Sequence, residues 1–207
     1  MLKKVLIIMV FIFASHAVAQ KKIGFGIKAG GNYTDVAGWV VDISKSKVGF
    51  HFGIVTSYEI SEKFSVTPEL TYSRQGFNYG EIEVREPTNN EIIVFEIINH
   101  LDYLNLPILG TYAVVPNFGL QFGPQFGFNI DAKNVLKYKH NAELNDPTPF
   151  EQTQDINTLE LGIAVGVQLK LSSHVFIQGR YIFGITSVFP NSKVQNRNAQ
   201  LSMGYNF

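Results

Sequence analysis

Asn198-Ala199-Gln200-Leu201-Ser202-Met203-Gly204-Tyr205-Asn206-Phe207 alternates strictly between polar or small residues and larger or apolar ones. A β-strand directs successive side chains to opposite faces, so this stretch has one apolar face and one small, polar face. A tilted strand needs roughly 9–11 residues to cross a bilayer, and this stretch is long enough. The same rhythm marks eight segments, near residues 23–34, 47–60, 64–77, 101–115, 118–131, 158–171, 174–186 and 197–207.

The connections between these segments alternate in length. Tight turns are predicted at Ser61-Glu62-Lys63, Pro116-Asn117 and Ser172-Ser173. Long polar segments lie near residues 35–46, 78–100, 132–157 and 187–196. The pattern predicts an all-β fold, an eight-stranded antiparallel up-and-down transmembrane β-barrel of the outer-membrane type. In a bacterial outer membrane both termini would then be periplasmic and the long loops extracellular.

The N-terminus has the form of a secretory signal peptide. Lys3 and Lys4 precede an apolar run, Val5–Ala14, that is too short to span a bilayer as a helix. That length disfavours the alternative, an N-terminal membrane anchor. Ala17-Val18-Ala19 forms an A-x-A cleavage site, so we expect residues 1–19 to be removed. The mature barrel domain would then cover residues 20–207 and begin at Gln20.

The composition also fits a membrane barrel. Hydrophobic residues make up 45% of the chain, aromatic residues 13% and charged residues only 16%, whereas soluble proteins average roughly 25% charged residues. There is no cysteine, so no disulfide can form. Without Lys3 and Lys4, 15 of the 17 basic residues remain against 17 acidic ones, a net charge of −2. This balance argues against a nucleic-acid partner.

Alternation alone leaves open which face points outward, because a lipocalin-like soluble barrel turns its apolar face inward around a ligand. The polar face of this chain is mostly Gly, Ser, Thr, Asn and Gln, which suits a narrow lumen. Aromatic residues lie near both ends of the apolar face, as in the interfacial girdles of membrane barrels. They are Tyr33, Phe50, Tyr72 and Phe128 at one rim, and Tyr58, Phe64, Tyr112, Phe118 and Phe207 at the other. The apolar face is therefore predicted to point outward.

The predicted register places several charged and amide side chains in the lumen. A charge in a low-dielectric tube must be paired or hydrated. We expect Lys28, Glu69, Glu160 and Arg180 to form a polar network that fills a closed lumen, because eight strands leave little more room than their own side chains need. The alternative is a minor porin-like or solute-binding path. The other predicted luminal residues are His51, Glu59, Gln121, Gln125, Gln168, Lys170 and Gln178.

A lipid-modifying enzyme is a further hypothesis. It is disfavoured because the sequence shows no set of a nucleophile, a base and an orienting group. His100 and Asp102 are the one His–acid pair close in sequence, with no serine nearby on that strand. His140 lies near Glu143 and Asp146 in a segment rich in turn residues, which is weak support for a calcium site. We therefore expect no catalytic residues, no metal and no cofactor.

One long loop has a pattern of its own. Two alternating apolar runs, residues 81–86 and 91–96, flank Pro87-Thr88-Asn89-Asn90. This predicts that the third and fourth strands continue beyond the membrane as a hairpin, whose edge could recruit a partner strand. The expected partners are outer-membrane lipids and lipopolysaccharide, and an envelope protein bound through the 78–100 and 132–157 loops.

Three segments carry a family resemblance. Gly26-Ile27-Lys28-Ala29-Gly30-Gly31-Asn32-Tyr33 resembles the opening motif of the PorT-like outer-membrane β-barrel family of Bacteroidetes. Tyr103-Leu104-Asn105-Leu106-Pro107-Ile108-Leu109 and Phe122-Gly123-Pro124-Gln125-Phe126-Gly127 resemble two later motifs of that family. The resemblance implies a small outer-membrane barrel, and the namesake branch of the family is tied to protein secretion, whereas most members have no assigned activity. It supplies no catalytic residues.

Overall fold

The computed structural model describes residues 23–38, 44–85, 92–140, 150–153 and 155–207. The predicted signal peptide, with Ala17, Ala19 and Gln20 at its cleavage site, lies outside the described residues, as do Glu143 and Asp146.

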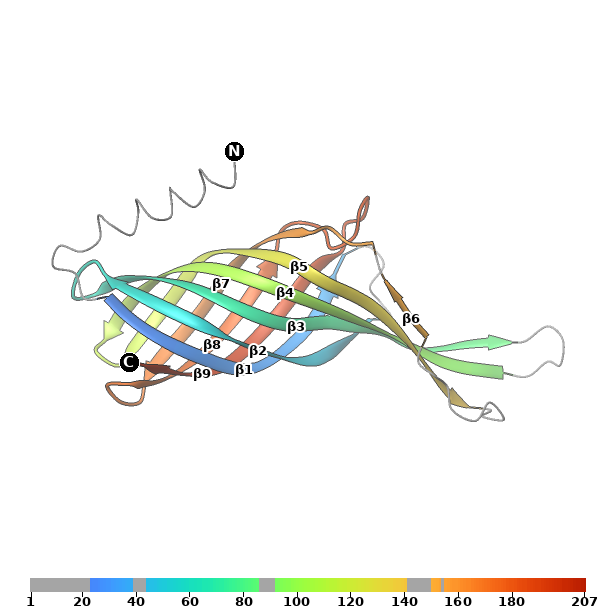
Figure 1. Cartoon of the computed structure of the whole chain (residues 1–207), viewed down its shortest axis with the longest axis horizontal. Coiled ribbons are helices and arrows are strands. Elements are labelled where there is room, and N and C mark those ends of the chain that lie inside the picture. The colour runs from blue at the N-terminus through green and yellow to red at the C-terminus, as the bar shows by residue number, and fades with distance from the viewer. Residues whose placement is uncertain (1–22, 39–43, 86–91, 141–149, 154) are drawn as a thin grey trace.

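Eight long strands form a closed antiparallel ring, which confirms the predicted fold (Figure 1). Each strand pairs with its neighbour in sequence, and β1 pairs with β9 to close the ring. A ninth strand, β6, lies outside the ring and pairs with β5. The strands are β1 (Ile23–Ala37), β2 (Ser44–Glu59), β3 (Phe64–Arg85), β4 (Ile92–Val115), β5 (Phe118–His140), β6 (Phe150–Thr153), β7 (Leu159–Lys170), β8 (Val175–Gly184) and β9 (Gln195–Asn206).

The two ends of the barrel differ. Three tight turns join β2 to β3, β4 to β5 and β7 to β8, and we call this the short-turn end. The start of β1 and the C-terminus lie there too (Figure 1), and the Phe207 amide donates to the Phe25 carbonyl over 2.9 Å. At the opposite, long-loop end, β3, β4 and β5 run far past the other strands.

The predicted hairpin is present in that extension. Ile82 pairs with Phe95, and Val84 pairs with Ile93, whereas the turn residues 87–90 lie outside the described residues. The prediction that residues 132–140 form a loop was wrong, because β5 continues to His140 alongside β4. Pairing with an already extended β4 satisfies the backbone of this polar segment, and sequence alternation does not report that contribution.

The apolar face of the strands points outward, as predicted. Phe25, Ile27 and Leu201 are 60%, 50% and 65% exposed, while Lys28, Gln178 and Ser202 are buried inside the ring. Such a continuous exposed apolar surface is what a lipid-facing barrel presents and what a soluble protein avoids. Within the part of the chain that the structure describes, no helix is long and apolar enough to cross a membrane.

The inside-to-outside polarity inverts toward the long-loop end. On β4, Leu104, Leu106 and Ile108 point outward and form part of this apolar band. Closer to the long-loop end on the same strand, Tyr103 and Leu101 are 1% and 0% exposed, so the apolar side chains there face inward. An apolar interior beneath a polar exterior is the arrangement of a water-soluble protein. The inversion therefore marks the level at which the barrel leaves the hydrocarbon.

Between that level and the long-loop end, the lumen is filled by a cluster of apolar side chains, which we call the apolar plug. Its buried members are Val36, Phe77, Leu101, Tyr103, Ala132 and Val188. The ring of Phe189, on the connection between β8 and β9, packs edge-on against Phe77 with centroids 6.1 Å apart. The Val188 carbonyl also accepts a hydrogen bond from the Asn157 amide over 2.8 Å. Part of the predicted 187–196 loop thus packs into the lumen as a member of this plug.

Candidate functional site

Three predicted luminal charges meet near the middle of the barrel as a central ion cluster of Lys28, Glu69 and Arg180. The Glu69 carboxylate lies 2.6 Å from Lys28 Nζ and accepts two hydrogen bonds from the Arg180 guanidinium, over 2.7 and 2.9 Å. Their side chains are 0–2% exposed. β3 and β8 lie on opposite sides of the ring, so the Glu69–Arg180 pair crosses the full bore.

A ladder of amides continues from this cluster toward the short-turn end. Lys28 Nζ donates to Gln178 over 3.1 Å, and the Gln168 Oε1 atom accepts from Gln178 and Gln121 over 3.4 and 3.0 Å. Gln121 also donates to Thr111 over 3.2 Å. These side chains come from five strands, β1, β4, β5, β7 and β8, so the ladder links much of the ring across the lumen.

The fourth predicted member, Glu160, has different partners. Its carboxylate accepts a hydrogen bond from the Asn196 amide, which also lies 3.4 Å from the Tyr103 hydroxyl. Tyr103 belongs to the apolar plug, so this contact sits at the border between the plug and the polar lumen. The sequence correctly placed Glu160 in the lumen, but it grouped Glu160 with Lys28, Glu69 and Arg180. Strand alternation predicts which face a side chain occupies, and it does not predict which residues that side chain contacts.

The structure also assembles a Ser–His–Asn array that the sequence analysis missed. His51 Nε2 lies 2.6 Å from Ser202 Oγ, and His51 Nδ1 lies 2.7 Å from Asn32 Oδ1. The residues come from β2, β9 and β1, three neighbouring strands of the ring. Gly30 lies between Ser202 and His51 in the pairing register and has no side chain to separate them. No local sequence signal connects these positions, because the contact arises only when β9 closes on β1.

Burial explains the role of this array. Ser202, His51 and Asn32 are 4%, 2% and 2% exposed, with the plug on one side and the central ion cluster on the other. The Asn32 amide donates to the Phe50 and Arg74 carbonyls, both over 2.9 Å, where the pairing of β2 with β3 is shifted. The array therefore fastens an irregular part of the barrel wall, and the Ser202 side chain is buried within it.

Two further histidines have described side chains. His100 Nδ1 lies 2.8 Å from Lys47 Nζ, while Asp102 binds Arg74 through two hydrogen bonds. His174 stacks on Tyr205 at the short-turn end, with centroids 5.5 Å apart. The side chain of His140 is not among the described parts of the structure. The described residues contain no group of three or more His, Cys, Asp or Glu that could hold a metal ion.

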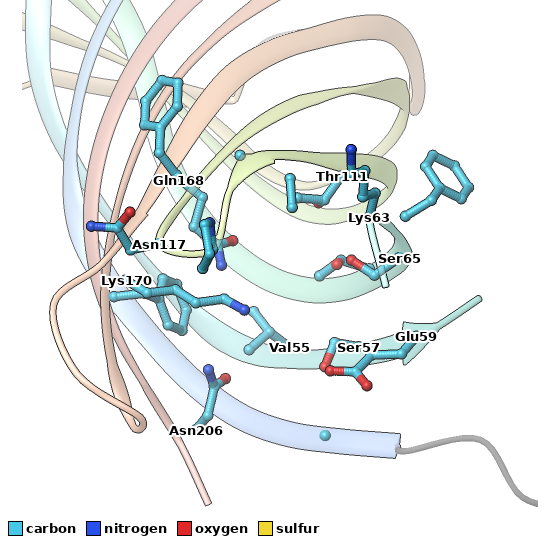
Figure 2. Close-up of a pocket in the computed structure, with 18 of the residues that line it drawn as sticks. Val55, Ser57, Glu59, Lys63, Ser65, Thr111, Asn117, Gln168, Lys170 and Asn206 are labelled. Atoms are coloured by element: carbon cyan, nitrogen blue, oxygen red, sulfur yellow. The ribbon is translucent and has the colours of Figure 1, made fainter. Parts of the chain in front are cut away.

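The short-turn end of the lumen is open. A cavity of about 630 Å³ extends from Gln168 and Gln178 to the three tight turns. Figure 2 shows part of its lining. Ser57, Ser65 and Thr111 line its walls, and Glu59, Lys63 and Lys170 lie around it. Gln168 and Gln178 of the amide ladder lie at the inner end of this cavity.

The projecting sheet is the second distinctive feature. It consists of residues 80–85 of β3, 92–98 of β4, 135–140 of β5 and the short β6. β3 pairs with β2 only as far as Tyr79, which lies opposite Ser44. Among the described residues, Glu81–Arg85 pair with β4 and have no pairing with β2, and we call this side of β3 the open edge.

The comparisons agree with this architecture. Residues 16–190 match the family model described as the outer membrane protein beta-barrel domain. The chain belongs to this family. It is therefore a small outer-membrane barrel, as its outward apolar band and closed ring also require. No curated protein matches the sequence.

Several solved outer-membrane proteins are similar to this chain at low sequence identity. A major outer membrane protein from Thermus thermophilus is 12% identical, with a TM-score of 0.50 over 90% of this chain and 100% of that one. Ail, the attachment invasion locus protein of Yersinia pestis, is 15% identical with a TM-score of 0.48, over 91% of this chain and 100% of that one. Neisserial surface protein A is 16% identical with a TM-score of 0.47, over 88% and 95%.

Proposed function

We propose that this chain is a non-conducting, non-enzymatic barrel that binds an envelope protein outside the cell through the open edge of its projecting sheet. The observation that carries the proposal is the pairing of β3, which loses its β2 neighbour after Tyr79 and continues to Arg85. An unpaired strand edge offers a row of backbone donors and acceptors that another strand can complete.

The side chains on this edge favour a particular partner. Glu81 and Glu83 are exposed on one face, and Val84, 45% exposed, lies on the other face with Ile82. A partner strand that alternates basic and apolar residues would match both faces, because opposite charges on neighbouring strands stabilise pairing. The acidic edge also discourages self-pairing, since Glu83 residues of two copies would lie near one another in an antiparallel pair.

The closed lumen supports the non-conducting part of the proposal. Ions that enter the short-turn cavity meet the amide ladder, the central ion cluster and then the apolar plug. We propose the orientation common to such barrels, with the short-turn end periplasmic and the projecting sheet outside. We also propose membership of the PorT-like branch. Lys28 and Asn32 of its opening motif make buried contacts that hold the barrel together.

A capture experiment tests the function. The full-length barrel carries an affinity tag in the Ser172-Ser173 turn and is purified from gently solubilised outer membranes. In a matched variant, an Asn-Gly turn replaces residues 81–96, which preserves the Tyr79–Ile97 pair and removes the open edge. The control is Lys193→Ala, at the same end of the barrel but off the projecting sheet.

The proposal expects a stoichiometric protein with the wild type and the control, and its loss from the shortened variant. Mass spectrometry identifies and quantifies the captured protein. An unchanged set of captured proteins in the shortened variant, with normal heat-modifiable mobility on gels, would exclude the projecting edge as the binding site.

A further inference from the structure

Two arginines lie over aromatic rings at the border of the apolar band that faces the long-loop end. Arg74 Cζ is 5.8 Å from the ring centroid of Phe50, and Arg197 Cζ is 5.9 Å from that of Phe183. Both rings are 45% exposed on the outward face. The two pairs occupy different sectors of the ring, because β2 and β1 separate β3 from β9. The same arrangement has therefore formed twice around the barrel.

Both arginines lie at the level where the polarity inverts. Arg74 is in register with Asp102, two residues beyond the outward pair of Tyr72 and Leu104. Arg197 is in register with Phe183, two residues beyond the pair of Ala199 and Tyr181. In a bilayer this level is the border between the acyl chains and the polar headgroups, where aromatic and basic side chains are stable together.

Other charged groups lie near Arg74. Lys47 reaches the same region and donates to the Asn99 carbonyl over 3.0 Å, and Lys133 is in register with His100. Asp102 forms the bridge to Arg74 over 2.8 Å, and Asp131 makes a longer contact of 3.6 Å with Lys133. The Arg74 side chain is still 42% exposed, so part of its guanidinium remains available.

Arg197 forms no ion pair with a carboxylate among the described residues. Its guanidinium donates to the carbonyls of Gly184 and Asn196, both over 2.9 Å, and to the Gln195 side chain over 3.1 Å. These neutral acceptors orient the group, and the carboxylate of Asp35, its partner in the β1–β9 register, accepts hydrogen bonds from Ser44 and Ser46. A guanidinium held over a ring is already ordered before a ligand arrives, which lowers the entropy lost on binding.

We propose that Arg74 and Arg197 bind the phosphate groups of lipopolysaccharide at two sites on the outer border of the apolar band. Guanidinium and phosphate form charge-assisted hydrogen bonds in two-point geometry, and the apolar band beside each site accepts the attached acyl chains. The choice of lipopolysaccharide rests on the orientation proposed above, which brings this border into the outer leaflet. The sites are separate from the projecting edge, so either proposal can fail without the other.

The test is a lipid titration of the purified full-length barrel in neutral detergent, with bound lipid counted by native mass spectrometry. The probes are lipopolysaccharide, the same lipopolysaccharide after enzymatic removal of its phosphates, phosphatidylglycerol and inorganic phosphate. The variants are R74Q/R197Q and the charge-retaining R74K/R197K. Lys63→Gln removes a positive charge at the short-turn end and serves as the matched control.

The wild type and K63Q should bind phosphorylated lipopolysaccharide at least tenfold more tightly than the dephosphorylated form. R74Q/R197Q should lose this preference, and R74K/R197K should retain most of it. A preference that survives in R74Q/R197Q, or none in the wild type, would overturn the proposal. Equal affinity for phosphatidylglycerol or inorganic phosphate would overturn the assignment to lipopolysaccharide. Heat-modifiable gel mobility confirms that each variant is folded.

Discussion

Arg180 and Glu69 form a two-point ion pair between strands that lie opposite one another across the barrel. Most cross-strand contacts in a barrel join neighbours that the backbone already connects, whereas this pair fixes the width of the bore directly. Lys28 completes the cluster with a second cation, so a single carboxylate holds two buried positive charges. The arrangement makes Glu69 the residue on which the middle of the lumen depends.

Glu69→Gln should therefore destabilise the barrel strongly. The substitution keeps the shape of the side chain but leaves Lys28 and Arg180 without a counter-charge, and breaking a buried pair costs about 3–5 kcal/mol. Urea unfolding of the reconstituted barrel, followed by gel mobility, measures the loss. Glu62→Gln, in the exposed turn between β2 and β3, should leave the midpoint unchanged. An equal midpoint for E69Q and the wild type would show that the cluster contributes little.

Conductance should be absent in the wild type and should stay absent when one barrier is removed. E69A/R180A opens the middle of the bore but leaves the apolar plug, and Phe77→Ala and Leu101→Ala thin the plug but leave the central ion cluster. The amide ladder, the central ion cluster and the apolar plug act in series, so the quadruple variant, which keeps the ladder, should also give no steps in a planar bilayer. Steps from the wild type would instead support the porin-like alternative.

The inverted polarity predicts opposite behaviour for two leucines on β4. Leu101 is fully buried in the plug, so Leu101→Ala should cost about 2–5 kcal/mol through lost contacts and the cavity left behind. Leu104 points outward into lipid and is 38% exposed, and Leu104→Ala leaves no internal cavity, so its cost should be clearly smaller. Unfolding midpoints of both variants in the same vesicles measure the difference. Equal losses would place both residues in the same environment.

These two leucines also show how far sequence reasoning reaches. Alternation identified the strands and the outward face because one environment, the bilayer, acts on every residue of the band. Alternation missed the plug because Leu101 lies where the environment outside the barrel changes from lipid to water. Beyond that point the apolar side chains of a strand face inward instead of outward. Alternation placed Lys28, Glu69 and Arg180 in the lumen correctly, but could not foresee the contact of His51 with Ser202, which depends on ring closure.

Ser202 should behave as a structural residue. A fluorophosphonate probe needs access to an activated serine, and the Ser202 hydroxyl lies inside a closed lumen. We expect no labelling of the native barrel, and a measurable loss of stability in His51→Ala because the Ser202 and Asn32 side chains lose a buried partner. Labelling that disappears in Ser202→Ala would reveal access that the structure does not show, and would reopen the enzymatic hypothesis.

The proposed orientation makes a prediction about intact cells. The sequence contains no cysteine, so single cysteines can be introduced at Asn89, Asn145 and Ser172 without background. Asn89 and Asn145 belong to the connections at the long-loop end, and Ser172 lies in a tight turn at the short-turn end. An impermeant maleimide should label the first two cysteines on intact cells and should reach Ser172→Cys only after the outer membrane is opened. Labelling of the Ser172 position alone on intact cells would mean that the short-turn end faces outward, and the projecting edge would then meet its partner in the periplasm.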